Sequence, residues 1–194
     1  PKGEYFPLRT IDPIADTPES LAADLATGAF YGIKPYPNFV PHPKGAEPSI
    51  PEMLPDWAMS LINDCGGLVM LHIPRKARLG DPANQREMRE LALRWPKARI
   101  VIAHLGRAYY LRNIVGQLDL LKGLPNLWWD FSMVNHWEVM AYAFKELGVD
   151  RILFGSDAPI VWAPGKSVEI NHQYSYVTPY KWDLSIHDSA PRVQ

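Results

Sequence analysis

The chain alternates short apolar runs with longer stretches in which apolar residues recur at helical spacing. Four of the six runs are nearly continuous in apolar residues, which is typical of strands buried on both faces of a parallel sheet. Each run is bounded by glycine, proline or a polar residue. The sequence therefore predicts strands over Tyr5–Ile11, Ala29–Ile33, Leu68–Leu71, Ile100–Ala103, Leu127–Phe131 and Ile152–Phe154.

The stretches between the runs have recognisable helix ends. Thr17 followed by Pro18 is a typical N-cap and first helical residue, and Asp81 followed by Pro82 repeats the pattern. The predicted helices are Pro18–Ala26, Ser49–Asn63, Pro82–Trp95, Tyr109–Lys122 and Trp137–Leu147. Strands and helices alternate throughout, which predicts a single α/β domain over residues 1–194 with a parallel sheet.

The length of the repeat favours one architecture. A polar residue closes each run, and the five intervals from Asp12 to Asp157 span 145 residues, about 29 each. A (β/α)8 barrel uses about 31 residues for each of its eight units, so six units would be an incomplete barrel. A doubly wound open sheet fits the pattern equally well, but neither a G-x-G-x-x-G motif nor a P-loop supports its nucleotide-binding form.

Composition restricts the class of partner. The formal net charge is −1, and 47% of the residues are hydrophobic, which argues against nucleic acid and membrane surfaces as partners. No apolar run approaches the roughly 20 residues that span a bilayer. Cys65 is the only cysteine, which fits a reducing compartment and predicts a cytoplasmic location. We expect a small-molecule substrate as the partner and leave self-association into a homo-oligomer open.

Chemically capable side chains close several of the runs. Lys34, His72, His104 and Asp157 each follow an apolar run directly or after a short turn. The carboxyl ends of parallel strands meet on one face, which carries the active site in barrels and in open α/β sheets. Two imidazoles and a carboxylate form a partial ligand set for Zn²⁺, Mn²⁺ or Fe²⁺. A metal-bound water with Asp157 as its proton acceptor would then provide hydrolytic chemistry.

Simpler interpretations exist for each residue alone. A histidine at a strand end is more often a hydrogen-bonded structural residue than a ligand, and Asp157 lies among turn-forming residues. Lys34, Arg75 and Arg107 could be ordinary surface charges, or they could bind a substrate carboxylate. Repetition of the pattern on successive strands favours the functional interpretation. A serine nucleophile is not indicated, since no G-x-S-x-G motif occurs.

These strand ends resemble the amidohydrolase superfamily, in particular the amidohydrolase-related branch that includes aminocarboxymuconate-semialdehyde decarboxylase. The likeness covers roughly residues 5 to 160, and the stretch RILFGSDAP is its most specific part. The motifs that carry it are Thr10–Pro13, Tyr31–Lys34, Ile102–Gly106 and Arg151–Pro159, with His72 in the place between the second and third of them.

The resemblance implies a distorted (β/α)8 TIM-type barrel, of which this chain would cover strands 3 to 8. It implies that His72 binds a divalent metal, most often Zn²⁺, and that Asp157 binds the metal or relays a proton. His104 would bind a second metal or act as acid and base on the substrate. Lys34 would bridge two metals in carbamylated form or face the substrate, where Arg75 is a second candidate for binding.

One departure from the family limits what these residues can do by themselves. The His-x-His pair of the family's first strand has no counterpart in the 194 residues. We therefore expect a portion of a longer polypeptide that is inactive alone. For the intact protein the leading hypothesis is a metal-dependent hydrolase of small C–N or C–O substrates. The alternatives are a non-oxidative decarboxylase of an aromatic or unsaturated acid, and an inactive barrel that serves as a binding module.

Overall fold

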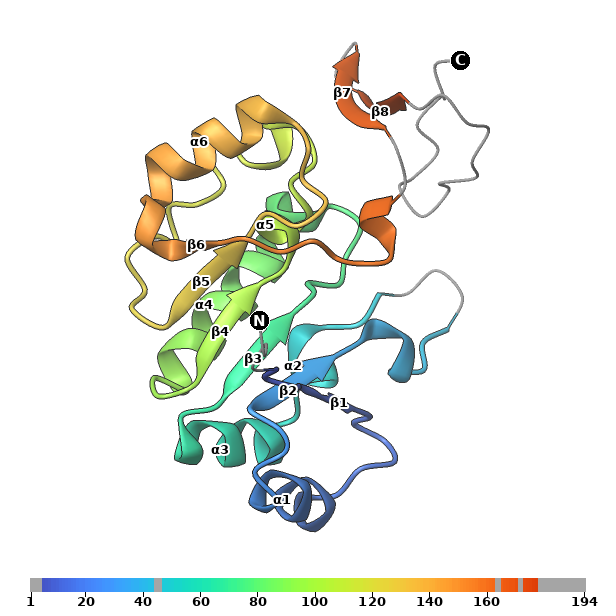
Figure 1. Cartoon of the computed structure of the whole chain (residues 1–194), viewed down its shortest axis with the longest axis vertical. Coiled ribbons are helices and arrows are strands. Elements are labelled where there is room, and N and C mark those ends of the chain that lie inside the picture. The colour runs from blue at the N-terminus through green and yellow to red at the C-terminus, as the bar shows by residue number, and fades with distance from the viewer. Residues whose placement is uncertain (1–4, 44–46, 163–164, 171–172, 178–194) are drawn as a thin grey trace.

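Six parallel strands form one curved sheet whose order follows the sequence (Figure 1). The computed structural model describes residues 5–43, 47–162, 165–170 and 173–177. All five strand pairs of the sheet are parallel. A doubly wound sheet needs a reversal of strand order, so the sequential order favours the barrel architecture. The strands are β1 (Arg9–Ile11), β2 (Gly32–Pro35), β3 (Leu68–Leu71), β4 (Arg99–Ile102), β5 (Leu127–Asp130) and β6 (Ile152–Leu153).

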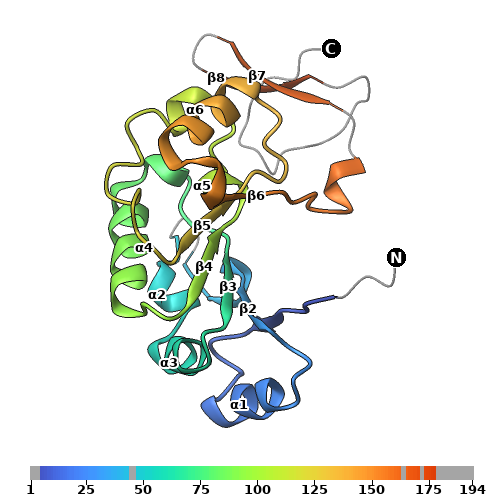
Figure 2. The same cartoon turned by 60° about the vertical axis from the view of Figure 1, so that its left-hand side comes forward.

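Helices cover one face of this sheet. Figure 2 shows α1, α3 and α4 on the same side of it. The helices are α1 (Pro18–Ala26), α2 (Ile50–Met53), α3 (Asp56–Cys65), α4 (Pro82–Arg94), α5 (His104–Arg107) and α6 (Trp137–Leu147). Short 3₁₀ turns occupy Pro37–Phe39, Arg78–Gly80, Leu111–Asn113, Val149–Arg151 and Ile160–Trp162. Beyond the sheet, β7 (Lys166–Ile170) and β8 (Gln173–Val177) pair antiparallel. None of the described helices is long and apolar enough to cross a membrane.

The core lies between the helices and the helix-facing side of the strands. Strand residues on that side are fully buried, whereas Lys34 on β2 and His72, which directly follows β3, are partly exposed. Burial of the apolar side chains is the main stabilising contribution. The strand and helix residues of this core include Ile11, Leu21, Ile33, Met59, Ile62, Val69, Leu71, Met88, Ile100, Ile102, Trp129 and Val139.

The predicted helix Ser49–Asn63 is two helices in the structure. Ser49 caps α2 through the backbone N–H of Glu52, and the helix ends at Met53. Pro55 then precedes α3 with an extended backbone. The residue before a proline is disfavoured in the helical region, so the single-helix prediction was wrong at Leu54, and the chain turns there.

The predicted helix Tyr109–Lys122 is also wrong. The structure has a 3₁₀ turn at Leu111–Asn113 followed by further turns. Gly116 has a φ of 72°, a left-handed conformation that a continuous helix does not contain. Ile114, Leu118 and Leu121 are nevertheless buried. Their spacing therefore reflects packing of these turns against the core and not a helix.

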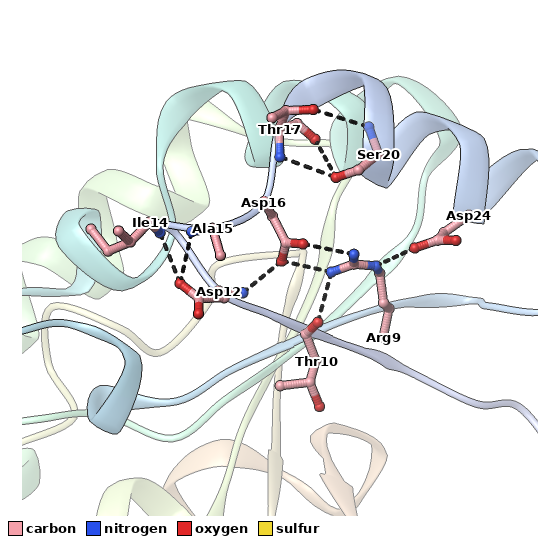
Figure 3. Close-up of polar contacts among 9 residues, drawn as sticks. All are labelled: Arg9, Thr10, Asp12, Ile14, Ala15, Asp16, Thr17, Ser20 and Asp24. Carbon is pink, nitrogen blue, oxygen red and sulfur yellow. Dashed lines mark hydrogen bonds and ion pairs between the residues drawn. The ribbon is translucent and has the colours of Figure 1, made fainter.

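A charged cluster ties strand β1 to helix α1 (Figure 3). Both terminal nitrogens of Arg9 donate to the Asp16 carboxylate at 2.7 Å, and Nε donates to Asp24 at 2.5 Å. Asp16 also accepts from the backbone N–H of Asp12, whose own carboxylate accepts from two later backbone N–H groups. The hydrogen bonds from Arg9 hold the pKa of Asp16 below its ordinary value. The cluster therefore fixes the turn that follows β1.

Replacing Asp16 by Asn should lower the free energy of unfolding at pH 7 by about 2 kcal/mol, because it removes charge-assisted hydrogen bonds from Arg9. The depressed pKa means that this stabilisation is complete above the pKa of an unfolded aspartate, about 3.9, and is lost as the pH falls through the lower folded value. Urea unfolding at pH 7 and below pH 4 measures both effects. Asp24→Asn is the control and should cost less, since its side chain is 42% exposed; an Asp16→Asn effect that does not change with pH would contradict the assignment.

Candidate active site

The strands β2, β3, β4 and β5 are neighbours in the sheet and have the same direction, so their carboxyl ends lie along one edge of it (Figure 1). Lys34 lies near the end of β2, His72 follows β3, and His104 follows β4 after one residue. Asp130 is the last residue of β5. Because the strands are parallel and adjacent, these side chains gather at one edge, as the sequence predicts.

His72 and His104 lie against one another. Their ring centroids are 5.4 Å apart, and the ring planes are inclined by 75°. His104 is 6% exposed. Nδ1 of His72 is buried and has no hydrogen-bond partner among the described residues. This nitrogen is therefore available to a ligand.

The surroundings of His72 are cationic. Burial, and to a lesser extent the nearby charges of Arg107, His104 and Lys34, lower the pKa of His72 to about 3. The imidazole is therefore neutral at pH 7 and can offer a lone pair. The positive charges of Arg107 and Lys34 near this imidazole favour an anionic ligand.

Residues at the end of β5 and just after it fix the position of His104. Its backbone N–H donates to Oδ1 of Asp130 at 3.0 Å. Its Nδ1 lies 2.9 Å from the backbone oxygen of Ser132 and 2.8 Å from the Ser132 hydroxyl. Both Asp130 and Ser132 are about 5% exposed. The position and orientation of the imidazole are thus set by buried hydrogen bonds.

The chain makes a left-handed turn directly after β4. His104, Leu105, Gly106 and Arg107 have φ values of 56°, 49°, 66° and 61°. This conformation costs roughly 1–2 kcal/mol for each residue that has a Cβ atom. A Cβ at Gly106 would lie 3.2 Å from the side chain of Leu79, so glycine also serves close packing here. Strain of this kind is common at functional sites.

Arg107 connects this turn to the loop after β3. Its Nη1 donates to the backbone oxygens of Pro74, at 2.5 Å, and of Arg75, at 3.2 Å. The guanidinium is therefore fixed next to the segment that begins with His72. Its charge acts on His72, as the lowered pKa of that imidazole indicates.

Asp157 follows β6 in a left-handed conformation, with a φ of 57°. Among the described residues no group of three or more His, Cys, Asp or Glu side chains lies close enough to hold a metal ion. The structure thus brings His72 and His104 together but does not complete a metal site with Asp157. A divalent metal fits these residues only in part, through the uncommitted Nδ1 of His72. The metal-binding and catalytic roles of His72, His104 and Asp157 stay predictions.

The two predicted substrate-binding residues differ in their surroundings. Lys34 is partly buried, and its Nζ lies 5.4 Å from the centre of the Tyr36 ring. Arg75 donates to both carboxylate oxygens of Glu87, at 2.8 and 2.5 Å, and to Asn84. This pairing raises the pKa of Arg75 and favours a structural role for that residue. Substrate binding by either residue stays a prediction.

Sequence reasoning did not single out Asp130 and Ser132 as site residues. Asp130 closes an apolar run just as His72 and His104 do, so the same rule could have found it. Ser132 carries no such signal, because its role depends on the path of the chain after β5. Only the structure shows its contact with His104.

Comparison with protein families decides the classification. The family model described as "Amidohydrolase" matches residues 4–178. The chain belongs to the amidohydrolase family. This confirms the resemblance carried by the strand-end motifs. No curated protein sequence matches the chain significantly.

Two solved structures have the same fold as this amidohydrolase-family chain. A 4-oxalomesaconate hydratase from Rhodopseudomonas palustris matches with 20% identity and a TM-score of 0.53, over 77% of this chain and 48% of that one. A 5-carboxyvanillate decarboxylase from Novosphingobium aromaticivorans, complexed with manganese and a nitrobenzoic acid, matches with 16% identity and a TM-score of 0.51, over 81% and 55%. The chain thus spans about half the length of these relatives and forms part of a (β/α)8 barrel, as predicted.

The neutral state of His72 predicts acid sensitivity of the metal-free protein. An unfolded histidine has a pKa of about 6.5 and His72 one of about 3 in the folded chain. Below pH 6.5 the unfolded state therefore binds a proton that the folded state does not, and stability falls until about pH 3. With chelator present, we expect the free energy of unfolding to fall by about 2 kcal/mol more in the native protein than in His72→Gln between pH 7 and pH 5. An equal fall in the free energy of unfolding of the two proteins between pH 7 and pH 5 would contradict this prediction.

Proposed function

We propose that the intact protein is a metal-dependent, non-oxidative decarboxylase of a small aromatic or unsaturated carboxylic acid. The observation that carries the proposal is the positive field around the histidine pair. Lys34 and Arg107 both act on His72 through their positive charge. A substrate carboxylate would be attracted by these two charges.

The hydrolase hypothesis receives less support. Positive charges favour binding of a carboxylic acid, which is an anion at pH 7, and give no such advantage to a neutral amide or ester. Two relatives with the same fold are named as a decarboxylase and a hydratase, and one of them is complexed with a substituted benzoic acid. These names support a substrate that carries a carboxylate, and they favour the decarboxylase over the hydrolase.

In this proposal each residue has a distinct task. Lys34 pairs with the substrate carboxylate, and His104 moves a proton at the substrate. His72 contributes an imidazole nitrogen to a divalent metal such as manganese or zinc, together with Asp157 and with ligands from outside the described residues. A bound divalent ion would neutralise negative charge on the substrate.

Carboxylic acids should be consumed with release of CO2, whereas matched amides should not be hydrolysed. The test is a panel of hydroxybenzoic and unsaturated acids, each paired with its amide, incubated with the intact protein and Mn²⁺ or Zn²⁺. CO2 release and ring or amide hydrolysis are measured side by side, with chelator-treated protein as the blank. Hydrolysis of the amides without CO2 release would overturn the decarboxylase assignment.

Lys34→Met should raise KM for the acid by about 10- to 100-fold, because a charge-assisted hydrogen bond to the carboxylate is lost. Steady-state kinetics on the acid identified by the panel measures this effect. Lys122→Met is the matched control, since Lys122 lies on the surface and pairs with Asp119 at 2.8 Å. Equal KM values for the Lys34 variant and the control would exclude Lys34 from substrate binding.

A further inference from the structure

Two oxygen atoms of one residue converge on Nδ1 of His104. The backbone oxygen of Ser132 lies at 2.9 Å and the Ser132 hydroxyl at 2.8 Å. The same hydroxyl lies 2.5 Å from Oδ1 of Asp130. The three side chains form a short chain of hydrogen bonds that is almost sealed from solvent.

Counting donors and acceptors leaves one arrangement of the hydrogens. A backbone oxygen only accepts, so the Nδ1 atom that faces it must carry a hydrogen. A carboxylate only accepts, so the Ser132 hydroxyl must give its single hydrogen to Asp130. The hydroxyl then offers a lone pair to the hydrogen on Nδ1. If Nδ1 were bare, its lone pair would face the backbone oxygen without any hydrogen between them.

We propose that Ser132 and Asp130 are positioning residues that hold neutral His104 in the tautomer with hydrogen on Nδ1, leaving Nε2 bare. In water, neutral histidine is free to exchange between its two tautomers, and its neighbours in a protein select one. Here two hydrogen-bond acceptors face Nδ1 and select the tautomer with hydrogen on that atom.

Further contacts keep the two residues in place. Oδ1 of Asp130 also accepts the backbone N–H groups of His104 and Ser132, at 3.0 and 2.9 Å. The orientation of the carboxylate is therefore fixed from both strand ends. On the other side, a Cβ at Gly155 would lie 3.1 Å from Cβ of Ser132. The absence of a side chain at Gly155 thus leaves the room that Ser132 occupies.

The tautomer determines what His104 can do first. With Nε2 bare, the imidazole starts as a proton acceptor or as a ligand through that atom, and it can donate a proton only after it has taken one up. This catalytic consequence rests on the proposed function. The tautomer itself does not, since it follows from the hydrogen bonds of the free protein.

Nitrogen NMR of histidine side chains tests the proposal without any substrate. The protein is labelled with ¹⁵N on histidine, kept free of metal with chelator, and recorded at pH 8, where imidazole is ordinarily neutral. Long-range ¹H–¹⁵N correlations distinguish protonated from bare ring nitrogens, and His104→Gln identifies the His104 signals by their loss. We expect Nδ1 of His104 in the protonated range and Nε2 in the bare range.

Ser132→Ala removes one of the two acceptors and should raise the ratio of the Nε2–H to the Nδ1–H tautomer about fivefold, the effect of one ordinary hydrogen bond. Ser156→Ala is the matched control, because the Ser156 hydroxyl accepts from the backbone of Ala158 instead. Its His104 signals should not change. A hydrogen on Nε2 of His104 in the native protein would overturn the proposal. An equal change of the His104 tautomer ratio in Ser132→Ala and in Ser156→Ala would also overturn it. If Ser132→Ala does not fold, the native spectrum alone decides the tautomer.

Steady-state kinetics of the Ser132→Ala variant separate this inference from the proposed function. With an acid that the native protein decarboxylates, Ser132→Ala should lower kcat and leave KM near its native value, because Ser132 acts through His104 and not on the substrate carboxylate. If no acid is turned over, the proposed function fails while the NMR result stands. An NMR spectrum with the wrong tautomer refutes the inference even if CO2 is released.

Discussion

Parallel pairing of consecutive strands is the constraint on which the arrangement of the site depends. Residues 26 or more positions apart in sequence become neighbours because each strand lies beside the next, with the same direction. The adjacency of His72 and His104 follows directly, since β3 and β4 pair with Leu71 opposite Ile102. Pairing of β4 with β5 likewise places Asp130, at the end of β5, within hydrogen-bond distance of the turn that begins at His104. A change in strand order would disperse these groups while leaving every local segment intact.

Much of this arrangement could be predicted from the sequence. The apolar runs located the strands, and the polar residue that closes each run indicated His72, His104 and Lys34. The limits are equally physical. Pro55 interrupts an otherwise helical pattern, and Gly116 permits a turn where buried apolar residues suggested a helix. Ser132 could not be recognised, because its contact with His104 depends on the three-dimensional path of the chain after β5.

The electrostatics of the site follow from burial as much as from charge. His72 is neutral because the imidazole is withdrawn from water, and the cations near it reinforce that state. Arg107 lies beside it and donates to the backbone oxygens of Pro74 and Arg75. A neutral base and fixed cations therefore coexist within one small region. Such a combination suits an anionic substrate from which, or to which, a proton must move.

The left-handed turn after β4 shows how strain and function are joined in this chain. Three residues with Cβ atoms adopt a conformation that is unfavourable by roughly 1–2 kcal/mol each. Several contacts offset this cost: Leu105 is fully buried, Gly106 donates to the backbone oxygen of Ala103, and the backbone N–H of His104 binds Asp130. A right-handed turn would carry the His104 side chain in another direction and break its contact with Ser132. The strain is therefore maintained by the same carboxylate that orients the imidazole, so the geometry of the turn and the hydrogen bonding of His104 depend on one buried group, Asp130.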